Sequence, residues 1–397
     1  MTTSNTTSIT DQKRILFINH AAVLGGGELS LVDLATHYRH TSEVLLFSDG
    51  PLVETLFFNN VKVSVTSLSE QVLAIKTNSG LAALNAIPDL VRCAYKIIAK
   101  AKQGFDIIHV NSQKALVVTA LANMLGDLPP IVWHLRDIIT ADHFSAMNRR
   151  IAVTLANRSI TKVIANSEAT AAAFIEAGGN PALVDVVYNG ISPKKFKGIK
   201  RTQCQTIRES LGIHDAPTIG VFSRLSFWKG QHIVLQALQQ LPGVHVMFVG
   251  DALFGETDYV EELRSLTDEL GVGNRVHWLG FRQDIPTLMQ TCDYIVHPST
   301  QPEPFGRVLV EGLFSQKPVI AAAAGGAIEI IQDRQTGRLF APNNVSHLVE
   351  TIRELQTYSE QAQTLAQRGY HHAHQRFSLD CLLNNFTYQI ETIYGYV

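Results

Sequence analysis

Two cations follow a short apolar run in the second half of the chain. Arg224 comes directly after TIGVFS (218–223), and Lys229 comes five residues later, where a helical stretch begins. Two fixed cations beside the backbone N–H groups of a helix N-terminus suit a diphosphate. The alternative is a pair of solvated charges on a loop. The P-loop pattern and the Gly-x-Gly-x-x-Gly fingerprint are absent from the sequence, so neither a P-loop NTPase nor a standard NAD enzyme is indicated.

Two carboxylates lie in the segment HPSTQPEPFGRVLVEGLFSQKPVIAAAAGGAIEII (297–331). Glu303 is on the loop after an apolar run, and Glu311 falls in a helix that reads as apolar on nearly all sides. A carboxylate there must be hydrogen-bonded or neutralised. One possible partner of Glu311 is Arg307 at i,i+4, an ion pair that stabilises an exposed helix by about 0.3 kcal/mol. The alternative, which we favour, is a ligand with two adjacent hydroxyls, such as a ribose. Gly325 and Gly326 open a further helix, where a polar ligand could approach the backbone N–H groups.

Short apolar or β-branched runs alternate with helical stretches along the whole chain, which is the pattern of buried parallel strands in βαβ units. Such sheets bind ligands outside the carboxyl ends of their strands, which is where the residues above lie. The predicted strands cover 14–20, 43–48, 61–67, 106–111, 131–135, 162–167, 185–189, 218–223, 245–250, 275–280, 294–299 and 318–323.

The order of strand, tight polar loop and helix occurs near residue 15 and again near residue 219, which predicts two Rossmann-like halves. Between them, NGISPKKFKGIKR (189–201) interrupts the periodicity, and we place a hinge there. We expect a disordered polar tail at 1–12, an N-terminal domain at 13–192 and a C-terminal domain at 193–377.

The amino-acid composition limits which cellular compartment and which binding partners are expected. The chain has 397 residues, 46% of them hydrophobic, with 33 Lys and Arg against 35 Asp and Glu. This balance excludes a disordered chain and gives no reason to expect a nucleic-acid partner. The cysteines form no Cys-x-x-Cys pair, which fits a reducing compartment and predicts core thiols at Cys93, Cys204, Cys292 and Cys381.

No signal-peptide pattern and no run of eighteen apolar residues is present in the sequence, so we expect a cytoplasmic protein without a transmembrane helix. The segment 90–102 places Arg92, Lys96 and Lys100 opposite Ile97 and Ile98. Such a helix either exposes its basic face to water or lies on an anionic membrane surface.

The group His371, His372 and His374 could suggest a metal site, but no matching partner pair lies near it in the sequence. We therefore expect a solvated helix there and no bound metal.

The run from Glu303-Pro304-Phe305-Gly306 to Glu311 resembles the Glu-x7-Glu motif of retaining glycosyltransferases with the GT-B fold, in particular glycosyltransferase family four. The resemblance extends to Arg224 with Lys229, to Gly325-Gly326, to YNGI (188–191) and to Gly25-Gly26-Gly27-Glu28, and so covers almost the whole chain. It implies an α/β protein of two Rossmann-like parallel-sheet domains that face each other across a cleft. It also implies that a C-terminal helix, at 378–397, crosses back to the N-terminal domain.

The resemblance also implies a role for each matching residue. Arg224 and Lys229 would hold the diphosphate of a nucleotide-sugar, and Glu311 would take the ribose hydroxyls. Glu303, with the amides around Phe305 and Gly306, would contact the transferred sugar. The remaining implied positions are Phe281 and Arg282 beside the nucleobase, Gly325 and Gly326 in the donor site, Gly25, Gly26, Gly27 and Glu28 at the acceptor and β-phosphate, and His134 at the sugar and acceptor.

By the same resemblance the protein would transfer a sugar to a hydroxyl of a carbohydrate, lipid-linked or small-molecule acceptor by front-face substitution. The sequence contains no Asp-x-Asp, the pattern of metal-dependent transferases, so we expect no metal requirement and no cofactor besides the nucleotide-sugar substrate. A nucleotide-sugar 2-epimerase and a non-catalytic sugar-nucleotide-binding protein remain as alternatives. For His134 the alternative is a hydrogen-bonded core residue.

Overall fold

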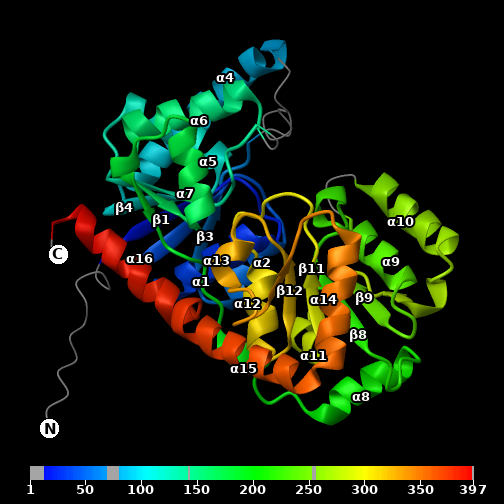
Figure 1. Cartoon of the computed structure of the whole chain (residues 1–397). Coiled ribbons are helices and arrows are strands. Elements are labelled where there is room, and N and C mark those ends of the chain that lie inside the picture. Colours follow the sequence, from blue (N-terminus) through cyan, green and yellow to red (C-terminus); the bar gives the residue numbers. More distant parts are fainter. Residues whose placement is uncertain (1–12, 69–79, 142–143, 253–255, 396–397) are drawn as a thin grey trace, which may run out of the picture. The chain divides into compact units, whose positions relative to one another are not determined.

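The computed structural model describes residues 13–68, 80–141, 144–252 and 256–395; the tail predicted at 1–12 lies outside these residues. Contacts between Cα atoms divide the chain into two compact units. Unit 1 comprises Met1–Gly190 with Leu382–Val397, and unit 2 comprises Ile191–Cys381. Each unit is built on one parallel sheet with helices on both faces (Figure 1). Among the described helices, none is long and apolar enough to cross a bilayer.

Unit 1 contains a seven-stranded parallel sheet in the order β3-β2-β1-β4-β5-β6-β7. Every residue of β1, β2, β4 and β5 is buried, because helices cover both faces of the sheet. The strands are β1 (Ile15–Asn19), β2 (Ser42–Leu46), β3 (Lys62–Val65), β4 (Ile107–Val110), β5 (Ile131–Leu135), β6 (Lys162–Ala165) and β7 (Val184–Val186).

Alternation along the strands of unit 1 sends successive side chains to opposite faces. Trp133 belongs to the hydrophobic cluster formed with the helices α4, α5 and α6, whereas His109 meets Phe386 of α16, with ring centroids 5.4 Å apart. The C-terminal helix therefore packs on unit 1, which confirms the predicted crossing helix. The helices are α1 (Gly26–His37), α2 (Pro51–Phe58), α4 (Gly80–Ala101), α5 (Gln113–Leu125), α6 (Ala146–Ser159), α7 (Glu168–Glu176) and α16 (Leu379–Ile393).

Unit 2 contains a six-stranded parallel sheet in the order β10-β9-β8-β11-β12-β13. All twelve predicted strands are present in the two sheets, and the strand that was not predicted is β13, at the edge of this one. The strands are β8 (Thr218–Phe222), β9 (His245–Val249), β10 (Val276–Trp278), β11 (Tyr294–His297), β12 (Val319–Ala322) and β13 (Arg338–Phe340).

The helices of unit 2 cover both faces of its sheet (Figure 1). A single-turn 3₁₀ helix, η4 (Phe227–Lys229), precedes α9. The α-helices are α8 (Arg201–Ser210), α9 (Gln231–Gln239), α10 (Thr257–Glu269), α11 (Ile285–Thr291), α12 (Arg307–Phe314), α13 (Ala327–Ile330), α14 (Val345–Thr357) and α15 (Ser359–Arg376).

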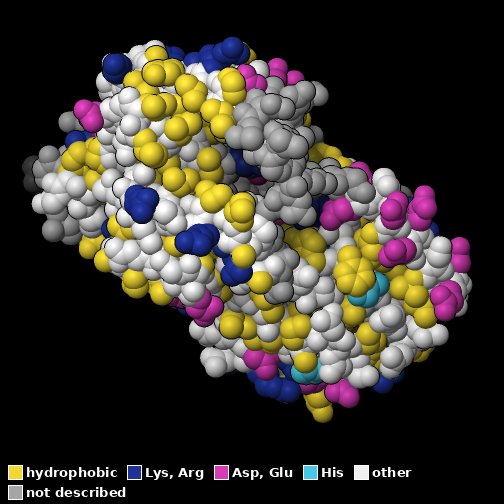
Figure 2. Space-filling view, turned by 90° about the horizontal axis from the view of Figure 1, so that it is seen from above, with side chains coloured by type: hydrophobic (Ala, Val, Ile, Leu, Met, Phe, Trp, Pro, Cys, Tyr) yellow, Lys and Arg dark blue, Asp and Glu magenta, His cyan; other side chains and the backbone are white. Residues whose placement is uncertain are grey.

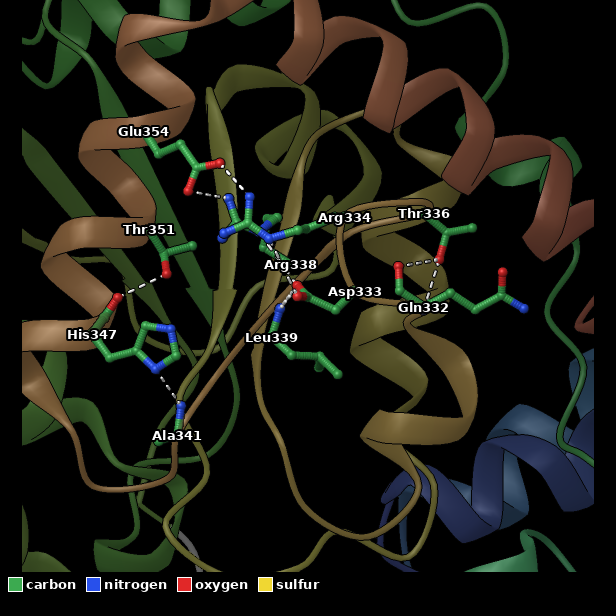
Figure 3. Close-up of polar contacts among 10 residues, drawn as sticks. All are labelled: Gln332, Asp333, Arg334, Thr336, Arg338, Leu339, Ala341, His347, Thr351 and Glu354. Atoms are coloured by element: carbon green, nitrogen blue, oxygen red, sulfur yellow. Dashed lines mark hydrogen bonds and ion pairs between the residues drawn. The ribbon is translucent and has the colours of Figure 1, made fainter.

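The edge strand β13 is held to α14 by ion pairs that Figure 3 shows. Arg338, which is 4% exposed, places Nη1 2.7 Å from Oε2 of Glu354 and Nε 3.3 Å from Oδ1 of Asp333. Arg334 donates to the other oxygen of Glu354 at 2.9 Å. Phe340 of this three-residue strand is buried in the core of unit 2, and the ion pairs fix the Arg338 end of the strand to α14.

The four cysteines are free thiols. Cys93 and Cys292 are buried as predicted, and burial raises the pKa of Cys93 to about 12. Cys204 and Cys381 are only half-buried, so the prediction of core thiols is wrong for these two.

Candidate functional site

The site in unit 2 forms where two adjacent strands end. β8 pairs with β11, so the loop after β8 and the loop after β11 leave the same edge of the sheet side by side. Gly230, with φ 73°, allows them to pack, because a Cβ atom there would lie 2.0 Å from the carbonyl oxygen of Pro298. The N–H of Thr300 donates to the carbonyl of Trp228 at 2.8 Å. The loop that carries Lys229 is thereby fixed against the loop that carries Glu303.

The central contact is an ion pair between Lys229 and Glu303. Nζ of Lys229 lies 2.7 Å from Oε1 and 2.6 Å from Oε2 of Glu303, and the two side chains are only 11% and 14% exposed. Two further donors face the carboxylate: Nε2 of His297 at 3.0 Å and Oγ of Ser299 at 3.1 Å, both to Oε2. The resemblance assigns these two charges separately, to a diphosphate and to a sugar; in the structure they neutralise each other.

The ion pair sets the protonation of both groups. Burial alone would raise the pKa of Glu303, but Lys229 and then His297 hold it well below its ordinary value. Burial lowers the pKa of Lys229; Glu303 opposes this effect, and Arg224 adds to it. Glu303 is therefore ionised over the whole physiological range.

Arg224 stands beside the same aromatic ring as Lys229. Nζ of Lys229 lies 3.9 Å from the ring centroid of Trp228, and the Arg224 guanidinium lies 5.5 Å from it. Nη1 of Arg224 is 3.8 Å from Oε2 of Glu256, and its side chain is 29% exposed. The two cations expected to bind a diphosphate thus both lie close to one indole ring.

Glu311 lies in α12, on a side of the helix that is less buried than expected. Arg307, Val308 and Glu311 are half-buried, while the buried residues are Leu309, Val310, Gly312, Leu313 and Phe314. The expectation that this helix is buried on nearly all sides is therefore wrong. Glu311 has access to solvent, so a ligand is not needed to compensate for burial of its charge.

The two glycines expected in the donor site support the Glu303 loop. Gly325, with φ 57°, forms an isolated parallel bridge with Glu303, and a Cβ atom at Gly325 would lie 2.3 Å from the Glu303 carbonyl oxygen. The N–H of Gly326 donates to that carbonyl at 2.7 Å, so it is already occupied. Phe305 is buried and its ring packs edge-on against Phe377 at 5.9 Å. Gly306, with φ 97°, is the N-cap of α12.

The expected nucleobase segment follows β10. The N–H of Phe281 donates to Oδ2 of Asp251 at 2.9 Å, and the Phe281 ring is 65% exposed. Arg282 forms a two-pronged ion pair with Asp284, at 2.8 and 2.7 Å. Asp251, at the end of the neighbouring strand β9, thus fixes the segment.

The glycine-rich loop of unit 1 leads from β1 into α1. Gly25 is the N-cap of α1 and makes no side-chain capping bond, and Gly26 and Gly27 begin the helix. Nδ2 of Asn19 donates to Oε1 of Glu28 at 3.2 Å, which ties the helix to the end of β1. A Cβ atom at Gly27 would lie 3.0 Å from Cδ of Arg136, so the loop rests on that side chain.

His134 lies inside unit 1, in a hydrogen-bonded cluster. It is fully buried, with Nδ1 3.1 Å from Nε2 of His109 and 3.2 Å from Nη2 of Arg136. Burial, and then Arg136, lower the pKa of His109 to about 3, and burial, Arg136 and His109 lower the pKa of His134. Both imidazoles are therefore neutral.

Arg136 is the centre of a polar network that the sequence did not single out. Its Nε donates to Oδ1 of Asn111 at 2.6 Å, and its Nη1 donates to Oδ1 of Asn189 at 2.8 Å. Asn189 also accepts from Oγ of Ser30 at 2.9 Å. His297 and Ser299 in unit 2 were missed as well. Arg136 directly follows the predicted strand 131–135, so the rule that located Arg224 would have found it. The others, except Ser30, fall inside predicted strands, which are 106–111 for Asn111, 185–189 for Asn189 and 294–299 for His297 and Ser299.

The histidines of α15 pack on aromatic rings. His374 lies 6.3 Å from Phe314, and His372 lies 5.6 Å from Phe377, between ring centroids. Within the residues that the structure describes, no group of three or more His, Cys, Asp or Glu side chains is arranged to hold a metal ion.

The chain matches two glycosyltransferase family models and curated glycosyltransferases. Residues 24–195 match the model described as Glycosyltransferase Family 4, and residues 204–372 match the model described as Glycosyl transferases group 1. D-inositol 3-phosphate glycosyltransferase of Mycobacterium leprae is 32% identical over 206 residues, which are 51% of this chain and 47% of that protein. The chain thus matches about half the length of this curated relative.

Solved structures match over nearly the whole chain. HepE of Anabaena, in complex with UDP and glucose, is 40% identical, with a TM-score of 0.87 over 96% of this chain and 99% of that one. Its complex with UDP-glucose gives a TM-score of 0.86. WaaG, a glycosyltransferase of lipopolysaccharide biosynthesis, matches with a TM-score of 0.70 over 96% of this chain and all of that one, at 19% identity, and shows the GT-B fold alone.

Proposed function

Because the chain belongs to glycosyltransferase family 4, we propose that it transfers a sugar from a nucleotide-sugar, in the first instance UDP-glucose, to an acceptor hydroxyl with retention of anomeric configuration. The observation that carries this proposal is the Lys229–Glu303 pair, with Arg224 beside it, at the carboxyl edge of the unit 2 sheet. One arrangement there offers cations to a diphosphate and a carboxylate to sugar hydroxyls. The complexes of HepE with UDP and glucose and with UDP-glucose support the choice of donor.

Front-face substitution uses only groups that this site and its substrates supply. The bond from C1 of the sugar to the diphosphate oxygen breaks, and the acceptor oxygen forms its bond to C1 on the same face. The acceptor proton passes to the departing diphosphate oxygen. Arg224 and Lys229 stabilise the charge that develops there, and each charge-assisted hydrogen bond contributes about 1.5–3 kcal/mol. No step requires a metal ion.

The roles of the other predicted residues belong to the same proposal. Glu303 binds hydroxyls of the transferred sugar, Glu311 binds the ribose, and Phe281 borders the base. The loop at Gly25–Gly27 approaches the acceptor and the β-phosphate. His134 supports the site from the N-terminal domain as a positioning residue, through its contacts with His109 and Arg136. A 2-epimerase would use the same donor without an acceptor, and a binding protein would release no nucleotide.

The first experiment is calorimetry with UDP, GDP and ADP and their glucose conjugates, followed by nucleotide release with candidate acceptors. We expect binding of UDP-glucose, and release of UDP that requires an acceptor. The product should show the anomeric configuration of the donor by NMR. An inverted product, or release of UDP with a 2-epimer and no acceptor, contradicts the proposal.

We propose a carbohydrate or lipid-linked acceptor and a cytoplasmic site of action, with peripheral contact at the inner membrane face. The two isoleucines expected on the apolar face of this segment of α4, Ile97 and Ile98, are buried in unit 1 and so are not available to a membrane. Lys100 is paired with the buried Glu43. Contact would therefore rest on exposed cations such as Arg92 and Lys96, and co-sedimentation with vesicles should require anionic lipid and fail at high salt. On the face drawn in Figure 2 the Lys and Arg side chains of the described residues are scattered, which gives no support for a nucleic-acid partner.

A further inference from the structure

His297 is a buried polar residue at the end of an otherwise apolar strand. It is the last residue of β11 and only 3% exposed. Its Nε2 lies 3.0 Å from Oε2 of Glu303 and 3.1 Å from Oγ of Ser299, which is also 3% exposed. The hydroxyl of Ser299 donates to the same carboxylate oxygen at 3.1 Å. His297, Ser299 and Glu303 thus form a closed three-membered cluster, which we call the Glu303 seat.

The seat and Lys229 differ in how they can respond to a ligand. Lys229 reaches Glu303 with a flexible side chain from η4, whereas His297 is held in the sheet and Ser299 follows it by two residues. If Lys229 turns toward a diphosphate, the buried Glu303 carboxylate loses its counter-charge. His297 and Ser299 then remain to satisfy and orient it. A purely apolar residue at 297 would avoid the cost of burying an imidazole, but it would leave Oε2 without this donor.

We propose that His297, steadied by Ser299, is the positioning residue that holds the Glu303 carboxylate in place for the hydroxyls of the donor sugar. The inference rests on the proposed function, since it takes Glu303 as the group that contacts the sugar. His297 itself touches no reacting atom. His297 affects donor binding only through Glu303. Replacing His297 should therefore no longer weaken binding when residue 303 is not a carboxylate.

The test is a double-mutant cycle on binding of UDP-glucose to the full chain, measured by calorimetry. His297→Phe should weaken binding by about 10- to 100-fold, the equivalent of one hydrogen bond to a charged group. His297→Gln keeps an N–H donor and should bind within about fivefold of wild type. In an E303Q background His297→Phe should weaken the affinity for UDP-glucose by less than about threefold. Because His297→Phe could fail to fold, Ser299→Ala provides a second variant, with an expected loss of about 3- to 10-fold.

His245→Gln is the matched control. His245 is the first residue of β9, so it lies at the amino ends of the parallel strands and not at the carboxyl ends that carry the site, and its Nδ1 contacts Nε2 of His277 at 2.9 Å. This variant should bind UDP-glucose as wild type does.

The outcomes separate this inference from the proposed function. If wild type binds none of the nucleotide-sugars tested, the proposed function fails and the inference fails with it. If wild type binds UDP-glucose and folded His297→Phe binds it equally well, only the positioning role is overturned. An equal loss for His297→Phe in the wild-type and E303Q backgrounds also overturns it, because the effect then reflects packing and not Glu303.

Discussion

Replacing Lys229 with Met should reverse the pH dependence of stability that Glu303 contributes. In the wild-type protein Lys229 holds the pKa of Glu303 below its ordinary value. A carboxyl group of this kind contributes stability that is present above its unfolded pKa and is lost as the pH falls through its folded pKa. Glu303 therefore contributes a nearly constant stabilisation between about pH 5 and pH 8.

The Met variant keeps the burial of Glu303 but removes its counter-charge. Removing one partner of a buried ion pair costs about 3–5 kcal/mol, and the remaining bonds from His297 and Ser299 put the expected loss near 3 kcal/mol. Without Lys229, burial is the largest influence on the pKa of Glu303 and is opposed by His297, and we expect this pKa to rise above its unfolded value. The contribution of Glu303 is then fully present below the unfolded pKa and is lost as the pH rises through the folded pKa. The destabilisation should therefore be largest at about pH 8 and shrink toward pH 5.

The assay is urea denaturation followed by tryptophan fluorescence at four pH values, with Trp228 in the cluster as a local probe. Lys229→Met is compared with the double variant Lys229→Met, Glu303→Gln, in which no buried charge remains. The double variant should recover most of the loss and show no added pH dependence. Lys197→Met, at an exposed lysine of unit 2, is the matched control.

Two results would refute this reasoning. One is a loss of stability in Lys229→Met that stays constant across the pH range. The other is a double variant as unstable as the single one, which would mean that packing of the lysine stem, and not the stranded carboxylate, causes the loss.

Three further predictions concern other parts of the molecule. EDTA should leave the rate of sugar transfer unchanged, because on the proposed function Arg224 and Lys229 supply the positive charge that stabilises the diphosphate. Activity that is lost with EDTA and returns only with Mn²⁺ would contradict this. His134→Ala should lower the thermal midpoint, at a cost of about 1–3 kcal/mol, and leave the KM for the donor unchanged; lost turnover with an unchanged midpoint would show a direct catalytic role. Arg338→Met should lower the free energy of unfolding by about 1–3 kcal/mol, since Asp333 and Glu354 lose the buried one of the two arginines that they contact. Arg334→Met, at a 65% exposed side chain, is the comparison and should lower the free energy of unfolding by less than about 1 kcal/mol in urea denaturation. If both variants lose the same free energy, burial of Arg338 does not explain its contribution.

The strands were predictable because their burial on both faces leaves continuous apolar runs. The exception, β13, has three residues and begins with Arg338, so it carries no such run. It is held by ion pairs to α14, a helix that follows it in the sequence. Contacts of this kind have no periodic signature, which is why the strand could be recognised only in the structure.

The site was predictable residue by residue but not contact by contact. Lys229 and Glu303 were each found from their place after a strand, yet they are 74 residues apart. Their contact depends on β8 lying next to β11, and this strand order cannot be read from runs of apolar residues. His297 and Ser299 were missed for a related reason: they sit within YIVHPS, which was counted as strand, and so were not considered as ligand-facing side chains.

The mutual neutralisation of Lys229 and Glu303 has a consequence for the choice of ligand. A ligand that offers only a phosphate group draws Lys229 away and leaves a buried carboxylate to the Glu303 seat alone. A free sugar can approach the carboxylate only in competition with the ammonium that already occupies both oxygens. A nucleotide-sugar, on the proposed function, replaces both partners at once, because its diphosphate takes the cation while its hydroxyls take the carboxylate. On the proposed function the ion pair thus favours the intact donor over its separate parts, in a chain whose net charge is only −2.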